Sequence, residues 1–222
     1  MDSKPRAVRT RAERKDARHN RELLIAAARR VFAAEGLGAP LDRIAAEAGV
    51  GSGTLYRHFP TRAELWEHVL AEPLGEQVRL LDEALADPDP WQGLAGYILA
   101  SCAMEASSRG YLNLMTTSFE DAPGLHELRM RIQLRITKLV ARARKHGAVR
   151  PDFTHQDLLF IALSNSRVIE VTQHVAPTAW RRNAELFLDS IRPERAHSLS
   201  EPPMSPQDIR EITQRSRRPP RA

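Results

Sequence analysis

The chain has 222 residues, of which 42% are hydrophobic and 27% are charged, and its formal net charge is +5. It contains no run of about 20 apolar residues, which argues against a membrane-spanning helix, and its single cysteine, Cys102, excludes an internal disulfide. The first twenty residues carry charges throughout and lack the apolar run of a signal peptide. We therefore expect a cytoplasmic protein of one large or two small domains.

The positive charge lies at the two ends of the chain. Residues 1–21 hold eight Lys or Arg against three Asp or Glu, and residues 192–222 hold seven Arg against four acidic residues. Basic ends of this kind often stay disordered until they meet a polyanion. We expect a basic flexible arm over residues 1–20 and a disordered Pro/Arg-rich tail over residues 193–222.

Residues 21–70 have the pattern of a helix-turn-helix. Apolar residues at helical spacing predict a helix that ends at Gly36, followed by two short helices over residues 40–48 and 52–58 with the turn Gly49–Gly51 between them. Two short helices joined by a glycine turn are typical of DNA-binding modules. The spacing alone does not distinguish such a module from a generic helical bundle.

The amino-acid sequence of this segment, from Arg21 to Val69, resembles the DNA-binding domain of the TetR family. The resemblance rests on the strings Ile44-Ala45, Gly49-Val50, Gly53-Thr54-Leu55-Tyr56 and His58-Phe59-Pro60. The family often has Ser or Thr where this chain has Ala39 and Gly51, and commonly Lys where it has Ser52. Both helix caps and one phosphate contact therefore depart from the family pattern. The resemblance implies a TetR-type transcriptional regulator in which Tyr56 and His58 bind phosphates.

The third helix is the predicted reading element. Helical geometry places Leu55 and Phe59 on its inner face, so that Gly53, Thr54 and Arg57 point outward. Arg57 can donate two hydrogen bonds to a guanine, and Gly53 lets the backbone approach the groove closely. Thr54 can contact a base or a phosphate. The predicted DNA-contacting residues are Ser52, Gly53, Thr54, Tyr56, Arg57, His58, Thr61 and Arg62.

The last two of these residues start a fourth helix. Thr61 and Glu64 have the spacing of a capping box. Arg62 stands in the first turn, where a positive side chain opposes the helix dipole, so we expect an external phosphate to explain it.

Residues 71–192 continue with helical periodicity and show no strand pattern. Pro and Gly residues, including Pro73, separate the predicted helices, which span residues 74–86, 91–107, 111–117, 125–146, 155–174 and 179–191. The family resemblance implies that this region binds a ligand and forms dimers. The expected fold is all-α, with a three-helix helix-turn-helix domain over residues 21–70 followed by this larger helical domain.

The last two long helices are the expected dimer contact. In the family they pair with their copies in a second subunit, and a homodimer implies a palindromic DNA operator. Their apolar residues offer more surface than one subunit obviously needs. The residues in question are Leu158, Leu159, Ile161, Ala162, Val168, Ile169, Leu186, Phe187 and Ile191.

The other helices would enclose an effector pocket. A wall of aromatic and methionine side chains suits a mostly apolar small molecule, although the same residues at helical spacing also serve as ordinary core. Glu105 and Asn113 would be its polar anchors. The candidate lining residues are Trp91, Tyr97, Cys102, Met104, Glu105, Tyr111, Asn113, Met115, Phe119 and Met130.

Signatures of catalysis are missing from the sequence. It has no glycine-rich phosphate loop and no nucleophile elbow, and its histidines are scattered, so we expect no enzyme activity, no cofactor and no metal site. The expected function is that of a repressor that a small, mostly apolar effector releases from its operator, and two alternatives stay open. One is a regulator of the same fold controlled by a protein partner, and the other is a helical enzyme or binding module with an incidental helix-turn-helix.

Overall fold

The structure, a computed structural model, describes residues 11–107, 114, 117 and 119–215. This part of the chain contains helices and no strand, which confirms the predicted all-α class. None of the helices in it is long and apolar enough to cross a membrane. The elements are α1 (Arg11–Glu35), α2 (Leu41–Glu47), α3 (Ser52–His58), α4 (Arg62–Ala86), α5 (Pro90–Ser107), α7 (Pro123–Lys145), η1 (His155–Asp157), α8 (Leu158–Thr172), α9 (Ala179–Ser190), η2 (Pro193–Arg195) and α10 (Pro206–Arg215).

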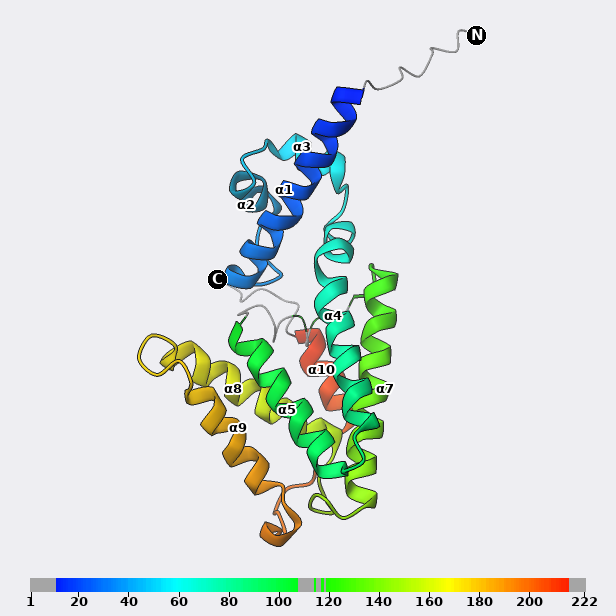
Figure 1. The fold of residues 1–222 in the computed structure, drawn as a ribbon, viewed down its shortest axis with the longest axis vertical. Coiled ribbons are helices and arrows are strands. Elements are labelled where there is room, and N and C mark those ends of the chain that lie inside the picture. Colours follow the sequence, from blue (N-terminus) through cyan, green and yellow to red (C-terminus); the bar gives the residue numbers. More distant parts are fainter. Residues whose placement is uncertain (1–10, 108–113, 115–116, 118, 216–222) are drawn as a thin grey trace.

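Helices α1, α2 and α3 form a small upper unit at one end of the molecule (Figure 1). The predicted inner residues of α1 are buried, with Leu24 at 0% and Phe32 at 2% exposure. Gly36 has φ of 84° and its amide donates to the Phe32 carbonyl at 3.0 Å. Because glycine adopts this left-handed conformation without strain, α1 ends where the sequence predicts.

The first helix begins earlier than predicted. We expected a flexible arm over residues 1–20, but α1 starts at Arg11, so the second half of that arm is helical. Residues 11–20 contain neither Gly nor Pro and are rich in Ala, Arg, Glu and Lys, which favour helix. Arg18 and Glu22 also form an ion pair of 3.0 Å one turn apart.

Helix α4 passes without interruption from the upper unit into the lower bundle (Figure 1). The sequence predicted a break at Pro73, and this was wrong, because the proline lies inside the helix. Proline removes one intrahelical hydrogen bond and disturbs the preceding turn, but packing can hold the helix together. Here Leu70, Leu74 and Leu81 along α4 are all buried.

Helices α5, α7, α8 and α9 pack with the lower part of α4 as a bundle, with α7 on one side and α9 on the other (Figure 1). The start of α7 is fixed by a side chain of α4, since Gly124 N donates to Glu67 Oε1 at 2.9 Å. At the other end, Arg142 of α7 donates to the carbonyls of Ala84 and Leu85, where α4 finishes. These contacts lock α7 along the length of α4.

Gly93 allows α5 to approach the end of α4. A Cβ atom at this position would lie 2.3 Å from the Ala84 carbonyl oxygen. We expect Gly93→Ala to lower the free energy of unfolding by about 1–3 kcal/mol, the usual cost of overpacking, as measured by urea denaturation. Gly96→Ala on the same helix is the control, because its Cβ would meet nothing within 4 Å. It should be neutral or stabilising, and equal losses in both variants would contradict the prediction.

The C-terminal tail is partly ordered, contrary to the prediction for residues 193–222. It contains η2 and α10. Helix α10 starts with a reciprocal cap, in which Ser205 N donates to Asp208 Oδ2 at 2.7 Å and Asp208 N donates to Ser205 Oγ at 3.2 Å. The prediction of disorder rested on the composition of the tail and did not consider the Ser205–Asp208 pair, which is a local signal for the start of a helix.

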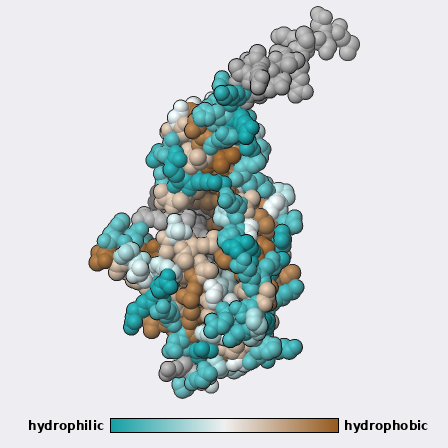
Figure 2. All heavy atoms as spheres, viewed as in Figure 1, coloured by the Kyte–Doolittle hydropathy of each residue, from teal (hydrophilic) through white to brown (hydrophobic). Residues whose placement is uncertain are grey.

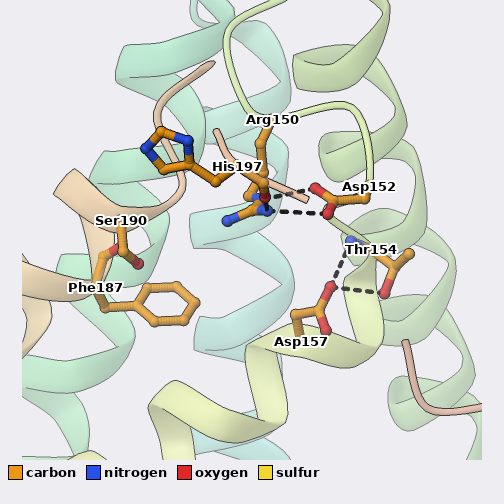
Figure 3. Close-up of polar contacts among 7 residues, drawn as sticks. All are labelled: Arg150, Asp152, Thr154, Asp157, Phe187, Ser190 and His197. Atoms are coloured by element: carbon orange, nitrogen blue, oxygen red, sulfur yellow. Dashed lines mark hydrogen bonds and ion pairs between the residues drawn. The ribbon is translucent and has the colours of Figure 1, made fainter. Parts of the chain in front are cut away.

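A second polar cluster ties the tail to the bundle (Figure 3). Arg150 pairs with Asp152, with Nε and Oδ1 2.6 Å apart, and also donates to the backbone carbonyl of His197 at 2.6 Å. Beside it, Thr154 N donates to Asp157 Oδ2 at 2.7 Å, which fixes the turn into α8.

Candidate nucleic-acid interface

The turn between α2 and α3 sets the position of the reading helix. Gly49 has φ of 69°, a conformation that favours glycine. Its amide donates to Ala46 O at 3.1 Å, and Val50 N donates to Ala45 O at 3.0 Å. These two bonds form the common glycine-terminated helix end, which turns the chain sharply into α3 at Ser52.

Helix α3 has the bounds that the sequence predicted and divides into two faces. Leu55 and the adjacent Phe59 are buried at 0% and 1% exposure and anchor the segment to α1 and α2. Four predicted contact residues, Ser52, Gly53, Tyr56 and Arg57, are exposed, while Thr54 and His58 are half-buried. Tyr56 is 48% exposed, which is high for a large aromatic side chain. An outward polar and aromatic face on a short, well-anchored helix is suited to entering a DNA groove.

Two contacts in this face bear on how it could bind. Arg57 Nη2 donates to Thr54 Oγ1 at 3.3 Å, so the two side chains lie together on the surface. A Cβ at Gly53 would meet nothing within 4 Å, so this edge of α3 is open. The structure thus brings Gly53, Thr54 and Arg57 together at the surface, as the helical geometry predicts.

The side chains of Thr61 and Arg62 form hydrogen bonds within the protein. Thr61 caps α4, since Glu64 N donates to its Oγ1 at 3.2 Å. Arg62 turns inward, and its Nη1 donates to Leu37 O at 3.0 Å and Ala39 O at 2.8 Å. Burial lowers the pKa of the Arg62 guanidinium. The sequence argument for a phosphate at Arg62 no longer holds, because two backbone carbonyls of the α1–α2 turn already explain its charge.

Arg21 likewise has an internal role. Its guanidinium lies 5.1 Å from the centre of the Phe59 ring and its Nη2 is 2.5 Å from His68 Nε2. Partial burial lowers the pKa of His68, and the nearby Arg21 charge lowers it further. Lys15 and Arg18, in the first half of α1, are exposed basic residues. The sequence analysis counted both as part of a flexible arm and so missed their fixed position on a helix.

The described members of the predicted effector set are spread over the bundle. Trp91 lies at the start of α5, stacked by Arg192 at 3.7 Å, about 20 Å along the helix from Met104. Met130 is 57% exposed on α7. Phe119 is buried with its ring edge against Trp66. The remaining described members, Tyr97, Cys102 and Glu105, are buried in the bundle, and Tyr111, Asn113 and Met115 lie outside the described residues.

Glu105 is a buried carboxyl group with incomplete hydrogen bonding. It is 5% exposed, and Asn165 Nδ2 of α8 donates to its Oε2 at 3.0 Å. Its Oε1 is buried and has no partner within the described residues. Loss of solvent raises the pKa of Glu105 to about 7, although the Asn165 and Ser166 side chains act to lower it.

This pKa predicts a pH-dependent stability. Because the folded pKa lies above the unfolded value near 4.5, the folded state gains stability by holding a proton and loses it as the pH rises through 7. Between pH 5 and pH 8 we expect the free energy of unfolding to fall by about 2–3 kcal/mol relative to Glu105→Gln, measured by urea denaturation. Glu185→Gln, which removes an exposed carboxylate, is the control. A constant difference between the wild type and Glu105→Gln across this range would contradict the prediction.

A cleft lies at the junction of the upper unit and the bundle. It has a volume of about 290 Å³, and we call it the junction cleft. On the face shown in Figure 2, hydrophilic residues cover most of the upper unit and apolar residues reach the surface near this junction. Among the described residues of the predicted effector set, Met104 lines this cleft and the others do not. The described residues that line it are Arg29, Phe32, Ala33, Leu37, Val69, Leu70, Glu72, Pro73, Met104, Ser107 and Leu114.

The expected dimer helices present apolar residues that the sequence analysis did not select. Of the nine residues that it listed, only Leu186 is exposed, and the others are buried or partly buried within the chain. Ile161 of α8 and Ile191, just beyond α9, are each 4% exposed. The outward apolar residues of α8 are Phe160, Leu163 and Val171. Helical periodicity finds an apolar face but cannot tell which of two such faces meets the core.

Two family models match the chain, one on each side of the middle of α4. Residues 24–69 match the model for bacterial regulatory proteins of the tetR family, and residues 89–193 match the C-terminal domain of SbtR-like transcriptional regulators. The chain belongs to the TetR family. It is therefore a transcriptional regulator with a DNA-binding helix-turn-helix, as the resemblance in its sequence implied.

A curated relative is also a transcriptional regulator. An HTH-type transcriptional regulator of Staphylococcus aureus (strain USA300) is 42% identical over 62 residues, which are 28% of this chain and 34% of that protein. The chain thus matches about a third of the length of this curated relative.

Two solved structures show the same fold. A bacterial regulatory protein of the tetR family from Rhodococcus RHA1 aligns over 78% of this chain and 97% of its own, with a TM-score of 0.58 and 22% identity. The ketosteroid transcriptional regulator KstR2 of Mycobacterium tuberculosis aligns over 78% and 94%, with a TM-score of 0.58 and 20% identity.

Proposed function

We propose that this TetR regulator is a cytoplasmic repressor that binds a palindromic operator as a homodimer and is released by a small, mostly apolar effector. The observation that carries the proposal is the outward face of α3, where Tyr56 and Arg57 are exposed and the half-buried Thr54 contacts Arg57, on a helix anchored by Leu55. In this proposal Arg57 reads a guanine and Tyr56 contacts a phosphate. Gly53 allows the close approach of the backbone.

In this proposal, different residues of the upper unit provide the affinity for DNA and the sequence specificity. Residues 22–72 carry five Arg against seven Asp or Glu, so bulk attraction cannot come from the helix-turn-helix itself. Lys15 and Arg18 on α1, together with the basic residues that precede them in the sequence, supply the positive charge. Contacts of this kind are independent of sequence and weaken with salt. We therefore assign affinity mainly to the N-terminal charges and specificity mainly to α3.

The proposed dimer uses α8 and α9. Phe160 and Leu163 of α8 and Leu186 of α9 are 52%, 46% and 59% exposed, and α8 and α9 pack against each other. Exposed large apolar side chains on two neighbouring helices favour a protein contact. Two-fold pairing would set the two copies of α3 about one turn of DNA apart, or a multiple of it.

Selection of genomic DNA fragments with the purified protein tests the proposal. We expect the recovered fragments to share a palindrome whose half-sites are about 10 base pairs apart, centre to centre, or a multiple of this. A single asymmetric site would contradict the dimer, and the absence of any enriched sequence would contradict operator binding. Reporter expression from the recovered promoter, with and without the regulator, separates a repressor from an activator.

A further inference from the structure

The junction cleft has the size and the walls of a small-molecule site. At about 290 Å³ it is at the lower end of the range for ligand pockets. Its walls are mostly apolar, with Phe32 and Ala33 from α1, Val69 and Leu70 from α4, and Met104 from α5. A molecule bound there would touch both the DNA-binding unit and the bundle.

Two charged side chains, Arg29 and Glu72, stand among the mostly apolar residues of the junction cleft. Arg29 lines the junction cleft, and its Nη2 donates to Glu72 Oε2 at 2.7 Å. The two side chains are 52% and 75% exposed, so this ion pair is open to water and weak. A guanidinium has five N–H donors arranged to receive a carboxylate in two parallel hydrogen bonds. A ligand carboxylate can therefore compete with Glu72 for Arg29.

The inner wall of the junction cleft connects to the core of the bundle. Gln77 Nε2 donates to Met104 Sδ at 2.9 Å, and Tyr97 OH donates to Gln77 Oε1 at 3.2 Å. Gln77 is fully buried and Tyr97 is 6% exposed. A ligand that moves Met104 would therefore disturb a buried hydrogen-bond chain between α4 and α5.

The junction cleft also lies beside the turn of α4 that contains Pro73. Pro73 is part of its lining and has no amide hydrogen to donate to the carbonyl of Val69, which lines the same cleft. Helices bend most readily where such a bond is missing. Since α4 joins the upper unit to the bundle, a change at this turn would change the angle between them.

We propose that the junction cleft binds a small carboxylic acid with an apolar body, and that this ligand changes the angle between helices α1–α3 and the bundle. The carboxylate pairs with Arg29, and the apolar body lies against Phe32, Val69 and Met104. The effect on DNA rests on the proposed function, whereas the binding of the acid does not.

Three probes that differ only in the head group test the chemistry: octanoate, 1-octanol and octylamine. Binding is measured by calorimetry and by NMR of ¹³C-methyl methionine, with the Met104 signal assigned from Met104→Leu. We expect octanoate to bind at least tenfold more tightly than the other two and to shift the Met104 methyl signal. Equal affinity for the three probes, or binding that leaves the Met104 signal unmoved, would overturn the proposal.

A matched pair of variants tests the role of Arg29. Arg29→Gln should reduce octanoate binding to the level of octanol, because it removes the partner of the carboxylate. Glu72→Gln breaks the same ion pair but keeps Arg29, so octanoate should bind as tightly or more tightly. Equal losses in the two variants would overturn the assignment. Ala33→Phe, which narrows the cleft, should weaken all three probes, and the glutamine pair remains decisive if this variant does not fold.

Operator binding with and without saturating octanoate tests the coupling. We expect at least a fivefold change in operator affinity, and by linkage the operator must change octanoate affinity by the same factor. Octanoate binding in the cleft with unchanged operator affinity would overturn the coupling and leave the site. Octanoate binding by a protein that recovers no DNA sequence would leave the site in place and contradict the proposed function.

Discussion

Replacing Tyr56 and Arg57 with Ala is expected to weaken operator binding by about 2–6 kcal/mol per dimer, which is about 30-fold or more. A bidentate hydrogen-bonded pair between Arg and guanine contributes about 1–3 kcal/mol to binding, and the variant loses this pair in both half-sites. Both side chains are exposed, so the thermal unfolding of the protein should not change. Fluorescence anisotropy with the selected operator measures the loss.

Three further variants separate charge from geometry in this experiment. Arg57→Lys keeps the charge but loses the planar fork, so it should relax the preference for guanine at one position of each half-site. Tyr56→Phe should weaken all sequences equally, as expected for a phosphate contact. Arg79→Ala removes one positive charge from an exposed ion-paired residue of α4 and is the matched control. Unimpaired binding by the double variant would contradict the assignment of α3.

Leu163→Glu is expected to weaken dimer formation by about 3–6 kcal/mol, because each protomer loses the burial of a large apolar side chain worth about 1.5–3 kcal/mol. The monomer itself should tolerate the change, since Leu163 is 46% exposed. Sedimentation velocity over a range of protein concentrations measures the shift. Operator affinity should fall with it, because two linked half-sites are needed for tight binding.

Leu134→Glu is the matched control for this experiment. Leu134 is 54% exposed on α7, on the other side of the bundle from α9 (Figure 1). This variant should sediment like the wild type. If Leu134→Glu produced monomers and Leu163→Glu did not, the dimer would use α7 in place of α8 and α9.

Local signals predicted the upper unit closely. Gly36 and Gly49 end their helices with positive φ, and α3 spans Ser52–His58 as predicted. Such signals act within a few residues, and so a single sequence contains them. Pro73 shows the limit of prediction from local signals. A proline normally marks a helix end, but the packing of α4 in the bundle keeps this helix continuous.

Side-chain partners distant in the sequence were beyond prediction. Arg62 looks like a free charge until the fold brings the carbonyls of Leu37 and Ala39 to it. The junction cleft has the same origin, since its walls come from α1, α4 and α5 and no local pattern unites them. The effector set stays a prediction for a related reason, since an apolar helix face does not say whether it meets a cavity or the core. Trp91 and Met104 show this, because they share a helix and not a site.

The continuous α4 has a consequence for exchanging parts between relatives. An α-helix turns about 100° and rises about 1.5 Å with each residue. A single-residue insertion or deletion in the middle of α4 would therefore swing both reading helices of a dimer around the α4 axis, even with every DNA-facing residue unchanged. Chimaeras that graft a new DNA specificity onto this chain must keep the residue count of Arg62–Ala86. Sequence comparison within the family should accordingly find length changes in loops and not in this helix.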